Sequence, residues 1–254
     1  LKSFLNIKDI RIRKKVELSL ENEDSYIPEP LIQFNPSYKI GKSLAELSQD
    51  PHIHPNLKKI FGSYKLYHHQ TEALEIGSSG KGFIVTSGTG SGKSLTFLAT
   101  IFNDILQSEN KEGIKAIIVY PMNALINSQE EEIKKYAINY LSDGLNWQGN
   151  AQSLDEQIQK LETLTGRKFP ITFGKYTGQE NTAERERIKS EKSNIILTNY
   201  MMLELIMTRQ SETWMRKSIT SHLKFLAFDE LHTYRGRQGA DVAMLIRRIK
   251  NLCQ

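Results

Sequence analysis

Cysteine is almost absent from this chain: Cys253 is the only one in 254 residues. A single thiol excludes an internal disulfide framework and a cysteine-based zinc cluster, so we expect an intracellular, cytoplasmic protein. No apolar run approaches the roughly 20 residues that a membrane-spanning helix needs. No secretory signal opens the chain, and its first residue is Leu1 rather than Met. We therefore expect a processed chain or a fragment of a longer protein.

The overall composition is that of an ordinary globular protein, with 39% hydrophobic and 25% charged residues. This composition excludes a disordered chain, a collagen-like chain and a coiled coil along the whole length. A chain of 254 residues forms one large domain or two small ones, and it buries a core without the help of disulfides.

The net charge of +5 is a weak indication of a polyanionic partner, but its distribution is uneven. Residues 214–254 contain eight Lys or Arg against three Asp or Glu, so the preceding residues are balanced in charge. The basic excess lies in the last sixth of the sequence.

Proline is concentrated near the start, where five of the seven prolines fall between Pro28 and Pro55. Because proline fixes φ and removes a backbone donor, this region excludes a long helix or a central strand. We predict that residues 1–60 are an extended leader over the surface of a domain at 61–254, with one short helix near 43–48. A partly disordered leader is the alternative.

Short apolar runs alternate with helical patterns in the rest of the chain, which predicts an α/β fold with a mainly parallel sheet and helices on both faces. The expected strands are 82–86, 115–120, 171–176, 194–198 and 223–228. The expected helices are 93–107, 124–141, 181–190 and 200–208. The polar stretch 142–170 interrupts this rhythm, so we interpret it as an insertion with a helix at 154–164.

A glycine-rich segment between the first expected strand and the following helix predicts a phosphate-binding loop. Its glycines let several backbone N–H groups point inward, and the helix N-terminus adds partial positive charge. Lys93 would reach the β- and γ-phosphates of a nucleotide, and the Ser94 hydroxyl would hold Mg²⁺. A glycine-rich hairpin without a ligand is the alternative. The segment reads Ser87, Gly88, Thr89, Gly90, Ser91, Gly92, Lys93, Ser94.

Two carboxylates follow the last expected strand, in the run Asp229, Glu230, Leu231 and His232. In parallel sheets, ligands bind at the carboxyl ends of the strands. Asp229 would hold Mg²⁺ through water, and Glu230 would orient the attacking water. A solvated loop is the alternative, and the upstream phosphate-binding loop favours the catalytic interpretation.

These two motifs together resemble motifs I and II of a superfamily 2, DEAH-like helicase, in its first RecA-like domain. The other motifs follow in order, and the resemblance covers residues 66–253. The segment 67–70 resembles the glutamine motif, 120–125 motif Ia, 176–178 motif Ib and 197–203 motif Ic. The acidic motif and its continuation to Gly236 are similar to a branch of DNA helicases in repair and in phage defence, including DISARM-type systems.

The resemblance implies a site for ATP and Mg²⁺ and a separate surface for nucleic acid. Gln70 would read the adenine and Tyr67 would pack against it, although a surface glutamine and a core tyrosine are the alternatives. His232 would link the nucleotide state to neighbouring elements. The implied contacts with nucleic acid are sequence-tolerant, and each could instead be a cap or turn residue: Asn123, Thr177, Gly178, Thr198 and Asn199.

Motors of this superfamily hydrolyse ATP between two RecA-like domains, and the second domain supplies arginine fingers. We expect this chain to lack that domain and therefore to bind ATP but turn it over slowly. Arg235 and Arg237 could stabilise transferred phosphate, bind DNA or contact a partner domain, and a solvated surface is the alternative. Subunits of a defence or repair system are further expected partners of the protein. The alternatives to a DNA motor are an RNA-remodelling ATPase and a nucleotide-dependent switch that does not translocate.

Overall fold

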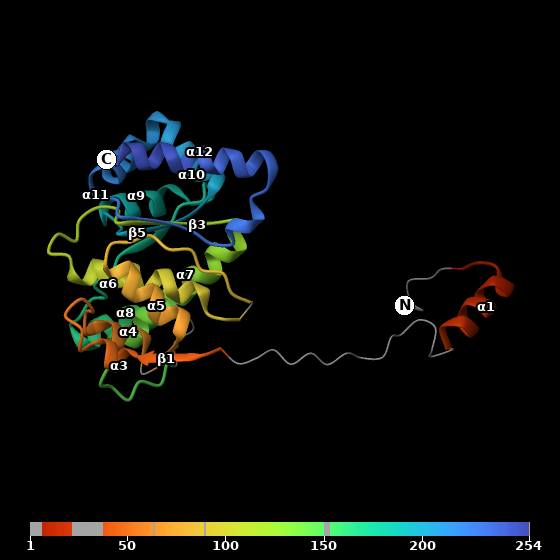
Figure 1. Cartoon of the computed structure of the whole chain (residues 1–254), viewed down its shortest axis with the longest axis horizontal. Coiled ribbons are helices and arrows are strands. Elements are labelled where there is room, and N and C mark those ends of the chain that lie inside the picture. Colours follow the sequence, from red (N-terminus) through yellow and green to blue (C-terminus); the bar gives the residue numbers. More distant parts are fainter. Residues whose placement is uncertain (1–6, 22–37, 63, 89, 150–152, 254) are drawn as a thin grey trace. The chain divides into compact units, whose positions relative to one another are not determined.

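The computed structural model describes residues 7–21, 38–62, 64–88, 90–149 and 153–253. It divides into two units, Leu1–Ser37 and Tyr38–Gln254 (Figure 1). In the first unit, helix α1 spans Ile10–Glu21, and the Asp9 carboxylate accepts the N–H of Arg11 at 2.8 Å. An extended leader was expected here, so the helix is a correction: the basic and apolar residues of this stretch contain no proline to break it.

A four-stranded parallel sheet forms the centre of the second unit, in the order β4-β5-β3-β6. This confirms the parallel α/β arrangement expected from the alternating pattern. Its strands are β3 (Ala116–Tyr120), β4 (Phe173–Lys175), β5 (Ile195–Asn199) and β6 (Phe225–Phe228). A separate antiparallel pair consists of β1 (Ile40–Ser43) and β2 (Lys65–Tyr67).

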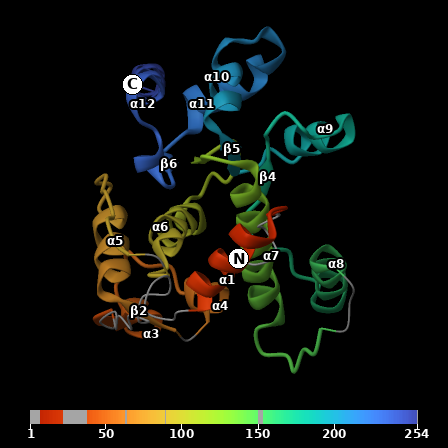
Figure 2. The same cartoon turned by 90° about the vertical axis from the view of Figure 1, so that its right-hand side faces the viewer.

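Helices cover both faces of the sheet, as Figures 1 and 2 show from two directions. One side holds α4 (Asn56–Phe61), α5 (His68–Ser78), α6 (Lys93–Gln107), α7 (Asn123–Ser142) and α8 (Leu154–Thr165). The other holds α9 (Thr182–Ser190), α10 (Tyr200–Thr208), α11 (Thr213–His222) and α12 (Gly236–Leu252). Two 3₁₀ turns, Gln210–Glu212 and Leu231–Thr233, connect elements.

The strands bury alternate residues in two separate cores because successive side chains of a strand point to opposite faces. Ile118 of β3 and Leu197 of β5 join the core with α4, α5, α6 and α7. Ile117 and Ile196, their chain neighbours, join the core with α9, α10, α11 and α12. A strand that is apolar at every position is therefore one that is covered on both faces.

Residues 38–61 belong to the compact unit, which corrects the expected leader boundary at residue 60. The short helix near 43–48 is confirmed as α3 (Leu44–Leu47), with Ser43 as its cap. Leu44 and Leu57 are fully buried in the same core as Phe102 of α6. The prolines permit this packing because they lie between short elements, with Pro55 immediately before α4.

Residues 82–86 do not form the expected strand, since 81–88 have no regular secondary structure. Among the described residues β6 pairs with β3 alone, and a cavity of about 770 Å³ is lined both by 81–87 and by 225–232. A strand exists only where its N–H and C=O groups find a partner. The segment has the apolar sequence of a strand without that partner, and Ile84 is 86% exposed.

The stretch 142–170 contains the expected helix, α8, which packs against α7. Lys134 of α7 lies 2.9 Å from the Asp155 carboxylate of α8, and Leu161 is fully buried. Its role as an insertion stays a prediction. None of the helices in the described ranges has the length and apolarity that crossing a bilayer requires.

A close approach between α5 and α6 depends on Gly77. A Cβ at this position would lie 2.8 Å from Thr100 Oγ1 and closer still to its Cγ2. Because α6 follows the glycine-rich loop directly, this approach also sets the distance between that loop and α5.

We expect Gly77→Ala to destabilise the protein by about 1–3 kcal/mol through overpacking, although alanine is the better helix former. The melting temperature should fall by roughly 3–10 °C for a domain of this size. Gly82→Ala is the matched control, because its Cβ meets nothing within 4 Å in the described part of the chain. The double variant Gly77→Ala/Thr100→Ala should recover most of the loss, and an unchanged melting temperature for Gly77→Ala alone would contradict the packing argument.

Candidate nucleotide and nucleic-acid sites

The glycine-rich loop leads directly into α6, as the sequence predicts. Gly90 and Gly92 have φ values of 75° and 67°, a region that favours glycine. The Lys93 ammonium lies 3.0 Å from the carbonyl oxygens of both Ser87 and Gly88, so its side chain closes over the loop. Ser87 and Ser91 join their hydroxyls at 2.6 Å across the loop. Thr89 lies outside the described residues.

Gln70 holds the loop against α5. Its Nε2 donates to the Gly92 carbonyl at 2.9 Å, and its Oε1 accepts the N–H of Tyr67 at 2.9 Å. A Cβ at Gly92 would lie 2.5 Å from that Nε2, so glycine is required there for space as well as for φ. Both ends of the amide are thus bonded within the chain, and Gln70 positions the loop.

Three aromatic rings gather beside this loop. Tyr67 and the His69 imidazole stack with centroids 5.8 Å apart, and Tyr38 lies 5.3 Å from Tyr67 and 5.8 Å from His69. His69 Nε2 also lies 3.0 Å from the Ser91 carbonyl. Sequence reasoning singled out Tyr67 but missed Tyr38 and His69. The signal that could have found His69 is its place beside Gln70; the distant Tyr38 carried none.

Asp229 and Glu230 leave the sheet at the carboxyl end of β6. The N–H of Asp229 still donates to Val119 of β3 at 2.9 Å, and the Asp229 carboxylate accepts the N–H of Glu230 at 3.0 Å. Glu230 has φ 48° and ψ 41°, a left-handed conformation that is uncommon for a residue with a Cβ. His232 Nδ1 lies 3.3 Å from the Glu230 carboxylate.

The phosphate-binding and acidic motifs face one cavity. Its volume is about 770 Å³, and its lining includes Lys93, Asp229, Glu230 and His232. Parts of the chain more than 130 residues apart in sequence are thus brought to one place. The sequence-predicted catalytic residues are together in the fold.

The residues expected to contact nucleic acid lie at the carboxyl ends of β3, β4 and β5. Asn199 donates from Nδ2 to Asn123 Oδ1 at 2.9 Å, so the ends of β3 and β5 are joined by their side chains. Asn199 Oδ1 also caps α10 by accepting the N–H of Met202. Thr198 is fully buried, and its hydroxyl donates to the Tyr176 carbonyl at 2.6 Å.

Glu180 occupies the donors of the loop after β4. Its carboxylate accepts the N–H of Thr177 at 2.9 Å, the Thr177 hydroxyl at 2.6 Å and the N–H of Gly178 at 2.8 Å. Glu180 is 8% exposed. Three donors on one oxyanion form the kind of cradle that also suits a phosphate. Sequence reasoning missed Glu180, because its partners are set by the turn geometry.

Comparison with known proteins agrees with these motifs. The DEAD/DEAH box helicase family model matches residues 67–254. The chain belongs to the DEAD/DEAH box helicase family. Within the match, the nucleotide-binding motor domain has the expected RecA-like α/β fold.

Several proteins are similar to this motor domain. The ATP-dependent helicase YprA of Bacillus subtilis is 28% identical over 193 residues, which are 76% of this chain and 21% of YprA. Druantia protein DruE of Escherichia coli is 23% identical over 322 aligned residues, covering 91% of this chain and 18% of DruE. The chain thus spans about a fifth of these relatives.

Crystal structures of the DUF1998 helicase MrfA share the fold. The form described as MrfA alone has a TM-score of 0.59 and 27% identity, over 80% of this chain and 27% of MrfA. The form bound to DNA has a TM-score of 0.62 and 24% identity, over 87% of this chain and 26% of MrfA.

Burial raises the pKa of the Asp229 carboxyl in the motor domain above its ordinary value of 3.8, and the nearby Glu230 charge adds to this. The N–H of Glu230 and the Lys93 ammonium act in the opposite direction and do not cancel the rise. Burial, followed by the Asp229 charge, also raises the pKa of Tyr120, whose buried hydroxyl has no hydrogen-bond partner in the described residues. An ionised Asp229 is therefore poorly compensated and suits a cationic partner.

Asp229→Asn should raise the melting temperature at pH 7 in the absence of nucleotide. The folded chain holds the Asp229 proton more tightly than the unfolded chain, so stability is lost as pH rises from the unfolded pKa to the folded pKa. Asparagine removes that loss and keeps an oxygen for the N–H of Glu230. The difference from wild type should shrink toward pH 3, as thermal melts across pH would measure. Asp241→Asn, an exposed carboxylate of α12, is the control, and a lower melting temperature for Asp229→Asn at pH 7 would refute the argument.

Proposed function

We propose that this chain is the ATP-binding motor domain of a helicase or translocase that couples ATP hydrolysis to movement along DNA or to its unwinding. The observation that carries the proposal is the shared cavity of Lys93, Asp229 and Glu230. It combines a cation for phosphate, a carboxylate for a metal and a carboxylate for water. The strand-end loops after β3 and β5 supply polar groups on the same edge of the sheet.

The nucleotide is held at two ends. The N–H groups of the loop from Ser87 to Gly92, including Thr89, bind the phosphates together with Lys93. The base lies against the rings of Tyr38, Tyr67 and His69. Gln70 reads adenine only if it exchanges one of its present bonds, and otherwise acts by holding the loop.

The residues present fit a magnesium ion bound with the nucleotide. Ser94 is the second residue of α6 and offers a hydroxyl. Asp229 offers a carboxylate, and its burial makes the negative charge costly without a cation. Bound Mg²⁺ would neutralise phosphate charge during transfer. Glu230 orients the attacking water. His232 lies 3.3 Å from the Glu230 carboxylate and links Glu230 to the turn that precedes α12.

A nucleic-acid strand crosses the loops at the carboxyl ends of β3, β4 and β5. Asn123 and Asn199 offer side-chain amides, and Gly178 is exposed. Thr177 and Thr198 are buried, so their side chains do not contact the strand but hold the backbone of these loops in place. Contacts of this kind bind phosphate and sugar, which predicts weak sequence preference and strong salt dependence.

DNA is the favoured strand because MrfA has been solved bound to DNA. RNA is the second candidate: DEAD-box ATP-dependent RNA helicase 57 of rice is 31% identical over half of this chain. We propose a role in DNA repair or in phage defence, because the acidic motif and its continuation to Gly236 resemble the branch of DNA helicases with those roles. We also propose that a second RecA-like domain completes the hydrolysis site, that the unit from Tyr38 to Gln254 is the motor domain and that the protein is cytoplasmic.

In the full-length protein, Glu230→Gln should lower the single-turnover rate of ATP hydrolysis at least about 100-fold, because the amide no longer polarises water. ATP affinity should stay within threefold, measured by equilibrium binding of a fluorescent ATP analogue. Lys93→Ala is the contrasting variant, because it should lose affinity as well as rate. If Glu230→Gln retains wild-type hydrolysis, the assignment of Glu230 is wrong.

Asn199→Ala should weaken binding of a labelled single strand about threefold to tenfold, because it removes an amide and the cap of α10 together. Fluorescence anisotropy with DNA and RNA strands of one sequence measures this and identifies the preferred polymer. Asn146→Ala, an exposed residue beyond the end of α7, is the control. Tighter binding of RNA than of DNA would favour the RNA-remodelling alternative, and no binding of either would favour a nucleotide switch.

A further inference from the structure

A second cavity lies at the edge of the sheet opposite the motor site. Its volume is about 360 Å³, and it is lined by residues that precede the strands: Gly113 and Ile114 before β3, Lys192 before β5 and His222 before β6. The motor site lies at the carboxyl ends of the same parallel strands. The two sites are therefore separate.

Three lysines give this second cavity a positive charge. The lining contains Lys189, Lys192 and Lys217 and a single carboxylate, that of Glu112, which lies 2.9 Å from Lys192. Lys217 makes no ion pair in the described part of the chain. The one ion pair of Lys189 there, with Glu186, is long at 3.9 Å and therefore weak. Two ammonium groups are thus left with little compensation, which favours an anionic ligand.

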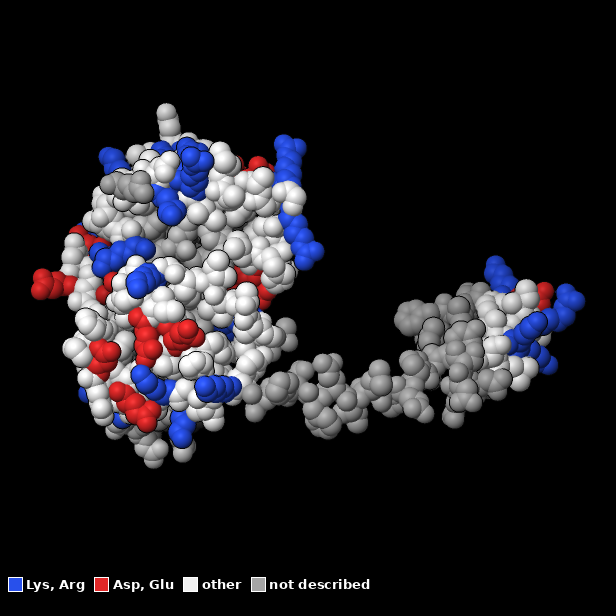
Figure 3. Space-filling view, viewed as in Figure 1, with Lys and Arg blue, Asp and Glu red and all other residues white. Residues whose placement is uncertain are grey.

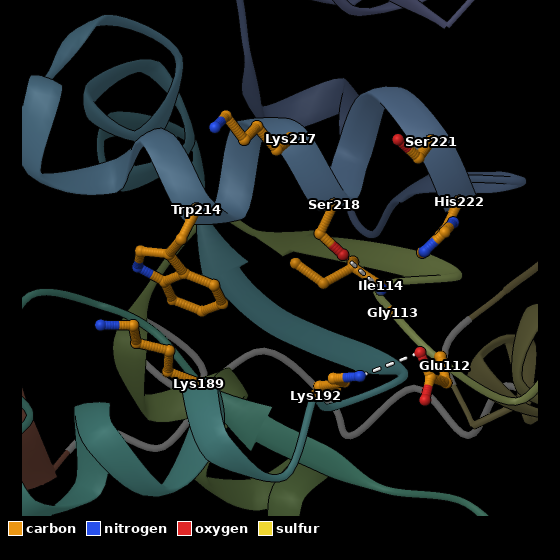
Figure 4. Close-up of a pocket in the computed structure, with 10 residues that line it drawn as sticks. All are labelled: Glu112, Gly113, Ile114, Lys189, Lys192, Trp214, Lys217, Ser218, Ser221 and His222. Atoms are coloured by element: carbon orange, nitrogen blue, oxygen red, sulfur yellow. Dashed lines mark hydrogen bonds and ion pairs between the residues drawn. The ribbon is translucent and has the colours of Figure 1, made fainter.

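Trp214 forms an aromatic wall of the same cavity. Figure 4 shows its indole extending from α11 toward the side of the cavity that carries Lys189. Its ring meets Tyr176 edge-on with centroids 6.5 Å apart, which fixes the indole from behind. A tryptophan held in this way among lysines offers a stacking surface for a planar ring.

Helix α11 presents hydroxyls and bases without any acidic residue in its ten positions. Ser218, which also lines the cavity, accepts the N–H of Ile114 at 2.9 Å and so joins α11 to the residues before β3. Lys217 and Ser221 also line a neighbouring cavity of about 440 Å³ together with Arg216. In the view of Figure 3 most of the charged side chains at the α11 and α12 end of this unit are Lys and Arg.

We propose that this cavity binds a nucleoside phosphate, with the base against Trp214 and the phosphate on Lys189 and Lys217. An acidic peptide would use the lysines but leave the indole without a partner ring. This nucleoside phosphate could come from two sources: it is a nucleotide within a single strand or a free mononucleotide. The first source rests on the proposed function, because a strand bound at the carboxyl ends of β3, β4 and β5 would also have to reach this cavity at the opposite edge of the sheet.

Trp214 itself provides the measurement. The chain has two tryptophans, so Trp147→Phe leaves Trp214 as the only indole. In this background the full chain is titrated with an eight-residue thymidine oligonucleotide, with thymidine monophosphate and with hexaglutamate, and Trp214 fluorescence is recorded. Anisotropy of the labelled oligonucleotide reports total strand binding in parallel.

Quenching by the oligonucleotide or the monophosphate, but not by hexaglutamate, is the expected result. The double variant Lys189→Glu/Lys217→Glu should lower the affinity for the ligand that quenches Trp214 at least tenfold. For the oligonucleotide the slope of log affinity against log salt should fall by about 1.4, the value for two phosphate contacts on a single strand. Lys160→Glu/Lys168→Glu, an equal charge change on exposed residues, should have less than a threefold effect.

Two results would overturn the proposal. One is strand binding by anisotropy with Trp214 unquenched by every ligand, which leaves the motor function intact. The other is equal quenching by hexaglutamate, which would identify an acidic protein partner. If the strand does not bind at all, the strand source fails with the proposed function, and quenching by the monophosphate decides the cavity separately.

Discussion

The parallel pairing of β3 with β5 and β6 is the constraint on which the other features of this motor domain depend. Residues 116–120 pair in register with 195–199, and 116–119 with 225–228. All three strands therefore end at one edge, where Asn123, Asn199 and Asp229 emerge within a few residues of their strands. The strands are short and apolar on both faces, so the helices that cover them are required for the sheet itself.

The glycine-rich loop depends on a second set of interactions. Its conformation comes from glycines at positive φ, but its position comes from Gln70 and His69, which bond its last carbonyls from α5. The contact of Gly77 with Thr100 keeps α5 close enough for those bonds. Local conformation and long-range packing thus act on the same few residues.

Charge is arranged differently at the two edges of the sheet. At the carboxyl edge, two partly buried carboxylates share a cavity with Lys81 and Lys93, and the raised pKa of Asp229 reflects the cost of that partial burial. At the amino edge, lysines and an indole surround a smaller cavity with a single carboxylate. The first edge thus favours a cation beside Asp229, whereas the second favours the anionic ligand that we propose for it.

The sequence alone identified the family, most strands and helices of the motor domain and residues that line the candidate nucleotide cavity. These follow from local patterns: apolar runs, helical spacing, a glycine-rich loop before a helix and a carboxylate pair after a strand. Helices α6 and α10 lie where the pattern predicted them, and Lys93 and Asp229 line one cavity.

Tertiary structure decided what depends on partners distant in sequence. Residues 82–86 are apolar like a strand, but β6 does not lie beside them to supply hydrogen bonds. Residues 44–61 carry prolines like a leader, yet their apolar side chains are in the core. The left-handed Glu230 and the hydrogen bonds of Glu180 also have no local signal. A local pattern encodes which conformation a segment prefers, whereas burial and hydrogen-bond pairing depend on which segments meet in the fold.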